Sequence, residues 1–318
     1  MEWPLVVLVG PTGVGKTALA VRLAERLGAE VVSADSRQVY RFLDIGTAKP
    51  TAEERRRAPH HLLDVVNPDR TMTLAEYQEM AYAAIDDVRS RGRLPLLVGG
   101  TGLYVTAVVE GWRMPRVAPD ENLRQTLLQR VEREGAMALH AELARVDPLA
   151  AARIDARNVR RVIRALEVYL LTGRPFSSQL GRQKPPHRVL WLGLTMPRPA
   201  LYERVDARID RMLAEGWIAE VRDLLGRGCS GSEPAFSALG YREVVAHIRG
   251  ELQLEKAVAL IRRHTRRFIR HQGAWFRADD ERIHWFDATQ PHDNAIEALV
   301  TSALAAQGVE CRRHAGAH

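Results

Sequence analysis

The chain has 318 residues, of which 46% are hydrophobic and 27% charged, a composition typical of folded globular proteins. It excludes a disordered, collagen-like or disulfide-stapled chain, and the length predicts about two domains at roughly 150 residues each. The net charge is +7, and arginine greatly outnumbers lysine. Arginine suits phosphate and base recognition. A genome rich in G and C also raises arginine content, so composition alone leaves nucleic-acid binding open.

The sequence carries no sign of secretion or membrane insertion. It begins with an acidic residue and enters an apolar run directly, unlike a signal peptide, and no stretch reaches the ~18 apolar residues of a membrane span. Its two cysteines, Cys229 and Cys311, are too far apart to indicate a metal cluster or a disulfide framework. We therefore expect a cytoplasmic protein without a membrane segment.

The first hundred residues alternate between predicted strands and helices. The apolar run at 5–9 predicts a buried parallel strand, and the segments 29–35 and 94–100 predict a second and a third strand. Amphipathic segments at 17–27 and 73–92 predict helices between them. This alternation is typical of a parallel sheet with right-handed crossovers.

The pattern changes after this first part of the chain. From Trp112 to His187 the sequence predicts helices with arginine on their faces and no clear strand. Residues 188–196 predict a strand that rejoins the first sheet. The segments 201–228 and 251–277 predict helices, and after Asp287 we expect one more helix and a frayed polar tail.

A glycine-rich motif follows the first predicted strand. The segment GPTGVGKT fits the spacing G-x-x-x-x-G-K-[ST] between a strand and a helix. Its glycines let backbone N–H groups turn toward an anion, and the helix N-terminus adds its dipole. We therefore predict a site for linked phosphates, with Lys16 on the phosphate oxygens and the Thr17 hydroxyl on Mg²⁺. The site comprises Gly10, Pro11, Thr12, Gly13, Val14, Gly15, Lys16 and Thr17.

The predicted fold class is α/β: a P-loop NTPase-like core, with a parallel sheet flanked by helices, at 1–111 and 188–318, and an all-helical insertion at 112–187. The ligand of the loop need not be a nucleotide. P-loop kinases and ATPases place an acid at the end of a later strand to organise Mg²⁺, whereas here that strand runs into Gly99-Gly100-Thr101-Gly102. Glycines there allow another chain or a ligand to approach the backbone closely. ATP binding at the motif, and hence a small-molecule or nucleotide kinase, is the alternative.

Asp35 follows the second predicted strand. Because the carboxyl ends of parallel strands meet at one edge of the sheet, we expect Asp35 near the phosphate loop. A carboxylate there can hold Mg²⁺ through water or act as a general base; capping a following helix is the structural alternative. Ser36 and Gln38 can pair with a base or with backbone, and Arg37 with phosphate.

Taken together, these features are similar to the tRNA dimethylallyltransferase (tRNA isopentenyltransferase) family. The matching segments run through nearly the whole chain in the family's order. They are GPTGVGKT (10–17), DSRQVYR (35–41), LDIGTAKP (43–50), PHHLLD (59–64), VGGTGLY (98–104), RVIRALEVYLLTGRP (161–175), FSALGYREV (236–244) and, more loosely, RHQGAWFR (270–277).

The resemblance implies transfer of a dimethylallyl group from dimethylallyl diphosphate to N6 of the adenosine immediately 3′ of the anticodon, in tRNAs reading codons that begin with U. It further implies Mg²⁺, a phosphate loop that holds diphosphate instead of ATP, an insertion that grips the anticodon stem-loop, and a monomer without an obligate protein partner. An RNA-binding protein that has kept only the fold is a second alternative.

Residue by residue, the resemblance implies that Asp35 is the general base at N6, and that Lys16, Thr101 and Arg208 are the other catalytic residues. Val39, Tyr40, Leu103 and Tyr104 are candidates for the wall around the prenyl group, with core packing as the alternative. The implied tRNA contacts are Asp35, Ser36, Arg37, Gln38, Thr101, Arg124, Arg160, Arg161, Val162, Ile163, Arg164, Gly240, Tyr241, Arg242 and Arg270.

Two arginine-rich helices add to this prediction. Arg157, Arg160, Arg161 and Arg164 recur at three- and four-residue spacing, which places them on one helix face. The segment 263–270 repeats the pattern and is followed by aromatic residues. Such faces suit RNA backbone binding, and solvated, ion-paired surfaces are the alternative.

Overall fold

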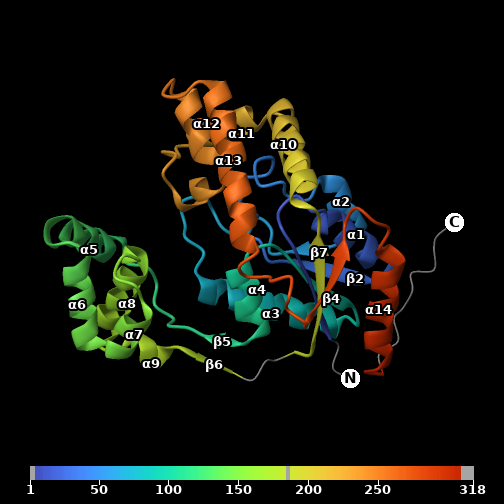
Figure 1. Ribbon diagram of the computed structural model, residues 1–318, viewed down its shortest axis with the longest axis horizontal. Coiled ribbons are helices and arrows are strands. Elements are labelled where there is room, and N and C mark those ends of the chain that lie inside the picture. Colours follow the sequence, from blue (N-terminus) through green and yellow to red (C-terminus); the bar gives the residue numbers. More distant parts are fainter. Residues whose placement is uncertain (1–3, 184–186, 309–318) are drawn as a thin grey trace. The chain divides into compact units, whose positions relative to one another are not determined.

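The computed structural model describes residues 4–183 and 187–308 (Figure 1). The chain divides into two compact units. The first comprises Met1–Met72, Glu76–Val109 and His187–His318, and the second comprises Glu110–Pro186 together with Thr73–Ala75. The insertion thus begins and ends close to the boundaries that the sequence predicts, 112 and 187.

A parallel sheet of six strands forms the centre of the first unit, in the order β3-β2-β4-β1-β7-β8. Helix α1 packs against β1, β2 and β4, and α14 packs against β7. The apolar runs of β1, β2 and β4 are buried along their whole length, as parallel strands covered on both faces require. The strands are β1 (Leu5–Val9), β2 (Ala29–Ser33), β3 (His60–His61), β4 (Leu94–Val98), β7 (Val189–Thr195) and β8 (Ile283–Asp287).

Most of the predicted elements are confirmed. The strand expected at 188–196 pairs in parallel with β1 and so rejoins the first sheet. The sequence prediction misses the strands β3 and β8, because β3 consists of only two histidines and β8 mixes polar with apolar residues. The helix expected at 201–228 is broken into α10 and α11 around Gly216, whose left-handed backbone (φ 102°) ends one helix and begins the next.

Helices α10 to α13 pack on one another and, in yellow and orange, form one cluster in Figure 1. Helix α13 ends close to the loop that follows β4, where Gln272 donates a hydrogen bond to the Gly100 carbonyl. The helices of this unit are α1 (Lys16–Leu27), α2 (Ala52–Arg57), α3 (Leu74–Ser90), α4 (Gly102–Val109), α10 (Arg198–Ala214), α11 (Trp217–Gly226), α12 (Tyr241–Ile248), α13 (Leu254–Gln272) and α14 (Asp293–Ala305).

The second unit is helical and has its own apolar core, built from residues such as Leu139, Leu143 and Leu166. The expectation of no strand there is wrong, because Trp112–Arg113 and Gly181–Arg182 form a short antiparallel pair, β5 and β6. The helices are α5 (Glu121–Glu134), α6 (Ala136–Val146), α7 (Pro148–Arg153), α8 (Val159–Thr172) and α9 (Phe176–Gln179).

Across residues 4–183 and 187–308, no helix has both the length and the apolar character needed to cross a membrane. Cys311 and the polar tail expected to fray lie outside the described residues.

Candidate active site

The phosphate loop joins β1 to α1 in the conformation that its sequence predicts. Gly13 has a φ of 83°, a left-handed conformation that L side chains rarely adopt. A Cβ atom at Gly13 would also lie 2.5 Å from Val205 Cγ2 of α10, so glycine lets α10 approach the loop. Helix α1 begins at Lys16 and therefore directs its N-terminal N–H groups and its dipole into the loop.

Lys16 reaches back over the loop. Its Nζ donates to the carbonyl oxygens of Gly10 and Pro11, at 2.9 Å each. Burial lowers the pKa of Lys16 to about 8, and Arg208 acts in the same direction while Asp35 opposes both. A bound anion would compensate this desolvated ammonium, so the loop is built to receive negative charge.

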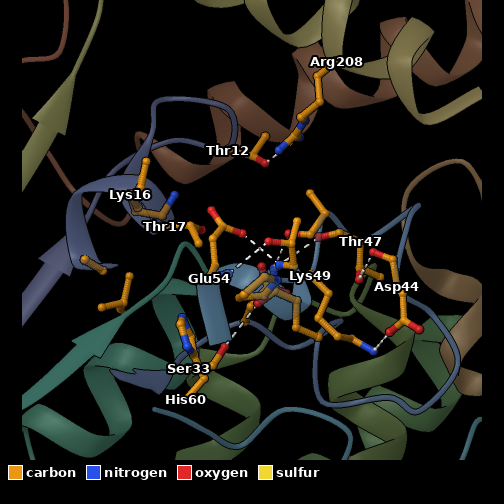
Figure 2. Close-up of a pocket in the computed structure, with 18 of the residues that line it drawn as sticks. Thr12, Lys16, Thr17, Ser33, Asp44, Thr47, Lys49, Glu54, His60 and Arg208 are labelled. Atoms are coloured by element: carbon orange, nitrogen blue, oxygen red, sulfur yellow. Dashed lines mark hydrogen bonds and ion pairs between the residues drawn. The ribbon is translucent and has the colours of Figure 1, made fainter. Parts of the chain in front are cut away.

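Helix α10 brings further positive charge to the loop. Arg208 Nη2 donates to Thr12 Oγ1 at 3.1 Å, a contact visible in Figure 2. Burial lowers the pKa of Arg208, with Arg211 and Arg204 adding to the effect and Asp35 opposing it. Its Nε is buried without a hydrogen-bond partner among the described residues.

Arg204 and Arg211 lie four residues before and three residues after Arg208, so all three share one face of α10. All three guanidinium groups line one cavity with the phosphate loop. Sequence reasoning singled out only Arg208, although the spacing of the three arginines on a predicted helix was a signal for the other two.

That first cavity has a volume of about 710 Å³. It is lined by Lys16 and Thr17 of the phosphate loop, by Asp35 beyond the end of β2, and by the loop at 44–51. Figure 2 shows Lys16, Thr17 and Arg208 on one side of this cavity and Lys49 and Thr47 on the other. Cationic walls of this kind suit a ligand with two linked phosphates and leave room for a short attached group.

Asp35 lies just beyond the end of β2. Its Oδ1 accepts the Arg37 N–H at 2.8 Å, which forms a tight turn. The alternative of a helix cap is wrong, because the residues that follow Asp35 form turns instead of a helix. Gln38 is held by the backbone, since its Nε2 donates to the carbonyls of Thr47 and Ala48 at 3.2 and 3.1 Å.

Thr101 lies across from this turn, at the start of α4. Its Oγ1 accepts the Ser36 N–H at 3.0 Å and donates to Ser36 Oγ at 3.3 Å. Asp35 and Thr101 both line a second cavity of about 310 Å³. Thr12, Asp35 and Arg208 line both cavities, so a group held in one can meet a group held in the other beside the Asp35 carboxylate.

Ion pairs of a buried lysine hold the loop at 44–51, which forms the wall of the first cavity opposite the phosphate loop. Lys49 Nζ donates to Asp44 and Asp64 carboxylates at 2.6 Å each and to the Tyr40 carbonyl at 2.8 Å. The Lys49 side chain is almost fully buried, and Figure 2 shows it reaching Asp44. Its charge is therefore already balanced, unlike that of Lys16, which lies beside the anion-binding loop.

Glu220 of α11 holds the same loop from its other side. Its Oε2 accepts the N–H groups of Asp44 and Ile45 at 2.8 and 2.6 Å, and its Oε1 accepts the Gly46 N–H at 3.3 Å and the Tyr241 hydroxyl at 2.7 Å. Three successive N–H groups directed at one carboxylate form an anion nest.

We expect Glu220→Ala to lower the free energy of unfolding by about 1–3 kcal/mol, because the loop loses hydrogen bonds to a charged acceptor. Urea denaturation measures this difference. Asp223→Ala on the same helix removes an exposed ion pair with Arg227 and should cost at most about 1 kcal/mol. Equal costs for the two variants would show that the nest contributes nothing beyond surface charge.

Two apolar residues expected to contact RNA are buried in the insertion instead, and the expectation for them is corrected. Val162 and Ile163 are only 1% and 5% exposed, in the core of the insertion. Arg124 and Arg164 both donate to the buried Glu167 carboxylate. These apolar and paired side chains stabilise α8 against its neighbours.

Gly240 and Tyr241 likewise belong to the packing of the first unit. A Cβ atom at Gly240 would lie 2.2 Å from the Trp217 ring, and Tyr241 is fully buried. Their neighbour Arg242 is exposed, as are Arg160, Arg161 and Arg270. These exposed arginines of the expected RNA-binding set can meet a polyanion directly.

Core packing also explains most of the expected prenyl wall. Val39, Tyr40 and Tyr104 are buried, and the Tyr104 ring stacks on Tyr77 with centroids 3.7 Å apart. Leu103 lines the second cavity. Other residues that line the first cavity together with Asp35 are Ser33, Gln38, Thr47, Val98 and Gly99.

The basic face of α13 is partly neutralised. Arg262 and Arg266 form ion pairs with Asp210 and Asp206 of α10, whereas Arg263, Arg267 and Arg270 are exposed. The ion-paired surface is thus confirmed for Arg262 and Arg266, and RNA binding by the exposed arginines stays a prediction.

The fold and the site define this chain as a P-loop α/β protein with a helical insertion and two cavities that share lining residues at the phosphate loop. A sequence model of the family described as IPP transferase matches residues 38–279. The chain belongs to the IPP transferase family.

Relatives and solved structures agree with this assignment. A protein of Thermomicrobium roseum named tRNA dimethylallyltransferase is 54% identical over 288 residues, which cover 91% of this chain and 87% of that protein. The full-length tRNA isopentenylpyrophosphate transferase of Bacillus halodurans superposes with a TM-score of 0.71 at 41% identity, covering 96% and 98% of the two chains. A eukaryotic dimethylallyltransferase acting on tRNA gives a TM-score of 0.78 at 25% identity, covering 98% and 81%.

Proposed function

We propose that this protein transfers a dimethylallyl group from dimethylallyl diphosphate to N6 of the adenosine immediately 3′ of the anticodon, in tRNAs that read codons beginning with U. Membership of the IPP transferase family and the names of the relatives support this reaction. The single observation that carries it in the structure is that Thr12, Asp35 and Arg208 line both cavities. A diphosphate donor on the loop and a base beside Thr101 would meet there.

In this reaction the bond between the allylic carbon C1 and the diphosphate oxygen breaks, and a bond from C1 to N6 forms. Negative charge grows on the leaving diphosphate. Lys16, Arg208 and the N–H groups at the start of α1 are positioned to stabilise that charge, and preorganised stabilisation of this kind is typically the largest catalytic contribution. Their charge thus favours ionisation of the donor.

Asp35 completes the proton balance. As the bond forms, N6 becomes cationic and must lose one proton, which the Asp35 carboxylate accepts. The hydrogen bond from the Arg37 N–H fixes the carboxylate with one oxygen engaged, so the other remains for the substrate. A positioned general base of this kind contributes about 10²–10⁴-fold.

The residues present fit a role for Mg²⁺ on the diphosphate. Thr17 offers a hydroxyl in the first cavity, and no cluster of three or more acidic, histidine or cysteine ligands occurs in residues 4–183 and 187–308. Magnesium commonly uses one or two protein ligands together with phosphate oxygens and water. When bound, it supplies further neutralisation of the leaving group.

An adenine must leave its stack before N6 can reach Asp35. Phe268 and Trp275, which are 38% and 44% exposed, line the second cavity and offer aromatic surfaces on which an unstacked base can rest.

Because the substrate is tRNA, we propose that the protein acts in the cytoplasm. We also propose that it acts as a monomer.

The proposed RNA surface of the insertion is tested by charge reversal. Arg160→Glu with Arg161→Glu should weaken tRNA binding and flatten its dependence on salt, because fewer phosphates are neutralised. Arg133→Glu with Arg145→Glu, two exposed arginines of α5 and α6, makes the same change in net charge. An unchanged salt slope for the first pair, or an equal loss for the control pair, would place the RNA elsewhere.

The reaction itself is tested by incubating the protein with Mg²⁺, unmodified tRNA and dimethylallyl diphosphate, followed by mass analysis of the nucleosides. A parallel reaction contains ATP in place of the prenyl donor. We expect an adenosine heavier by one dimethylallyl group in the first reaction only. ATP consumption without prenylated adenosine would favour a kinase.

A further inference from the structure

Gln272, the last residue of α13, connects two loops of the active site. Its side chain is buried, with 5% of the residue exposed. Its Oε1 accepts the Thr12 N–H at 2.9 Å, and its Nε2 donates to the Gly100 carbonyl at 3.0 Å. Because an amide N–H only donates and a carbonyl only accepts, a single orientation of the carboxamide satisfies both partners.

Each partner is one step from a residue of the proposed chemistry. The Thr12 hydroxyl accepts from Arg208, which lines both cavities. Gly100 precedes Thr101, whose hydroxyl holds Ser36. One carboxamide therefore ties the phosphate loop, which would hold the donor, to the loop that would hold the acceptor base.

The surroundings are shaped for this bridge. A Cβ atom at Gly100 would lie 2.3 Å from Gln272 Nε2, and one at Gly102 would lie 2.2 Å from Trp275 Cγ. The backbone N–H of Trp275 donates to the backbone carbonyl of Gln272 at 3.0 Å. This hydrogen bond extends the contact from the end of α13 to the glycine-rich loop at 99–102. The glycines after β4 thus admit the C-terminal turn of α13, in the close approach that glycine permits.

We propose that Gln272 is a positioning residue for prenyl transfer, an inference that rests on the proposed function. It holds the phosphate loop and the loop at Thr101 in register, so that the C1 atom of the donor and N6 of the acceptor come together beside Asp35. Gln272 does not itself act on the reacting atoms. The Thr12 N–H donates to Gln272 and is therefore not available to a bound diphosphate.

Removing the Gln272 side chain should lower the rate of prenyl transfer without weakening the binding of diphosphate or tRNA. For Gln272→Ala we expect kcat to fall about 10–100-fold, because a misplacement near 1 Å between reacting groups can cost 10²-fold. The dissociation constants for inorganic diphosphate with Mg²⁺ and for tRNA should stay within about threefold of wild type. Gln253→Ala, an exposed glutamine immediately before the first turn of the same helix, should leave kcat unchanged.

Gln272→Glu gives a readout that mere packing would not. The ionised carboxyl can accept from Thr12 but repels the Gly100 carbonyl, whereas the protonated carboxyl has both a donor and an acceptor. The rate of this variant divided by the wild-type rate should therefore rise as the pH falls from 8 to 5.5. Dividing by the wild-type rate removes the contribution of other nearby groups that titrate or carry charge. These groups are Lys16 of the phosphate loop, Asp35 and Arg37 after β2, Arg208 of α10 and His271 of α13.

The outcomes are distinct. A fall in kcat with retained binding for Gln272→Ala, together with recovery of Gln272→Glu at low pH, supports the positioning role. Wild-type kcat in Gln272→Ala, an equal loss of rate and of both affinities, or a flat pH ratio in Gln272→Glu overturns it. If the wild-type protein itself transfers no prenyl group, the proposed function fails instead.

Discussion

Replacing Asp35 with asparagine should lower the rate of prenyl transfer about 10²–10⁴-fold, the range that a lost general base costs. Asparagine keeps an oxygen that can accept the Arg37 N–H, so the turn after β2 should persist. Its amide cannot take the proton from N6. The measurement is the single-turnover rate with saturating donor and tRNA.

Binding separates chemistry from structure in this test. The dissociation constant for tRNA should stay within a few-fold for Asp35→Asn, and Asp35→Ala should lose the turn as well as the base. Loss of tRNA binding in both variants would make Asp35 a structural residue. Full activity of Asp35→Asn would remove it from the proton transfer.

Lys16→Met should lower kcat about 10²–10³-fold, the cost of removing one preorganised group that stabilises developing charge. The ammonium is held at the phosphate loop by the Gly10 and Pro11 carbonyls. Lys256→Met, which removes an exposed lysine at the start of α13, makes the same change in net charge and should be silent. Comparable losses in the two variants would point to net charge alone.

The lowered pKa of Lys16 gives this prediction a dependence on pH. With a pKa of about 8 in the ligand-free protein, Lys16 is charged below that pH and increasingly neutral above it. An anion binds the charged form, so the affinity for inorganic diphosphate should fall as the pH rises through 8. The slope should be smaller in Lys16→Met. Calorimetry in buffers of different ionisation enthalpy should detect more proton uptake on binding at pH 8 for the wild type than for Lys16→Met, because any change in protonation of the diphosphate itself is common to both proteins.

The conformation of the loop at 10–17 and the place of Asp35 beside it follow from local sequence patterns. Lys16 and Thr17 follow from fixed spacing between a strand and a helix, and Asp35 follows from the rule that parallel strands end at one edge. Both rules rest on short-range geometry, so one sequence is enough to apply them. The strand at 188–196 was found for the same reason, because its apolar run is continuous.

Long-range contacts escaped prediction. Gln272 is 260 positions from Thr12 and 172 from Gly100, and no periodicity in the sequence joins them. The anion nest around Glu220 depends on a loop about 175 positions earlier in the chain, at Ile45. Such contacts follow from packing between α10–α13 and the sheet loops, which the order of elements alone does not specify.

A resemblance transfers segments more safely than single side chains. The resemblance implies one RNA-binding stretch that comprises Arg160, Arg161, Val162 and Ile163. Val162 and Ile163, however, face the core of the insertion. On a helix, consecutive residues point in different directions, so at most part of any such stretch can meet RNA. The apolar character of Val162 and Ile163 already indicated their burial.

The most direct test of the account is a crystal structure of the protein with Mg²⁺ and an unreactive donor, in which sulfur replaces the oxygen between the dimethylallyl group and the diphosphate. We expect the diphosphate on the phosphate loop between Lys16 and Arg208, with the C1 atom directed toward Asp35 and the second cavity. A diphosphate bound elsewhere, or a prenyl group directed away from Asp35, would contradict the account.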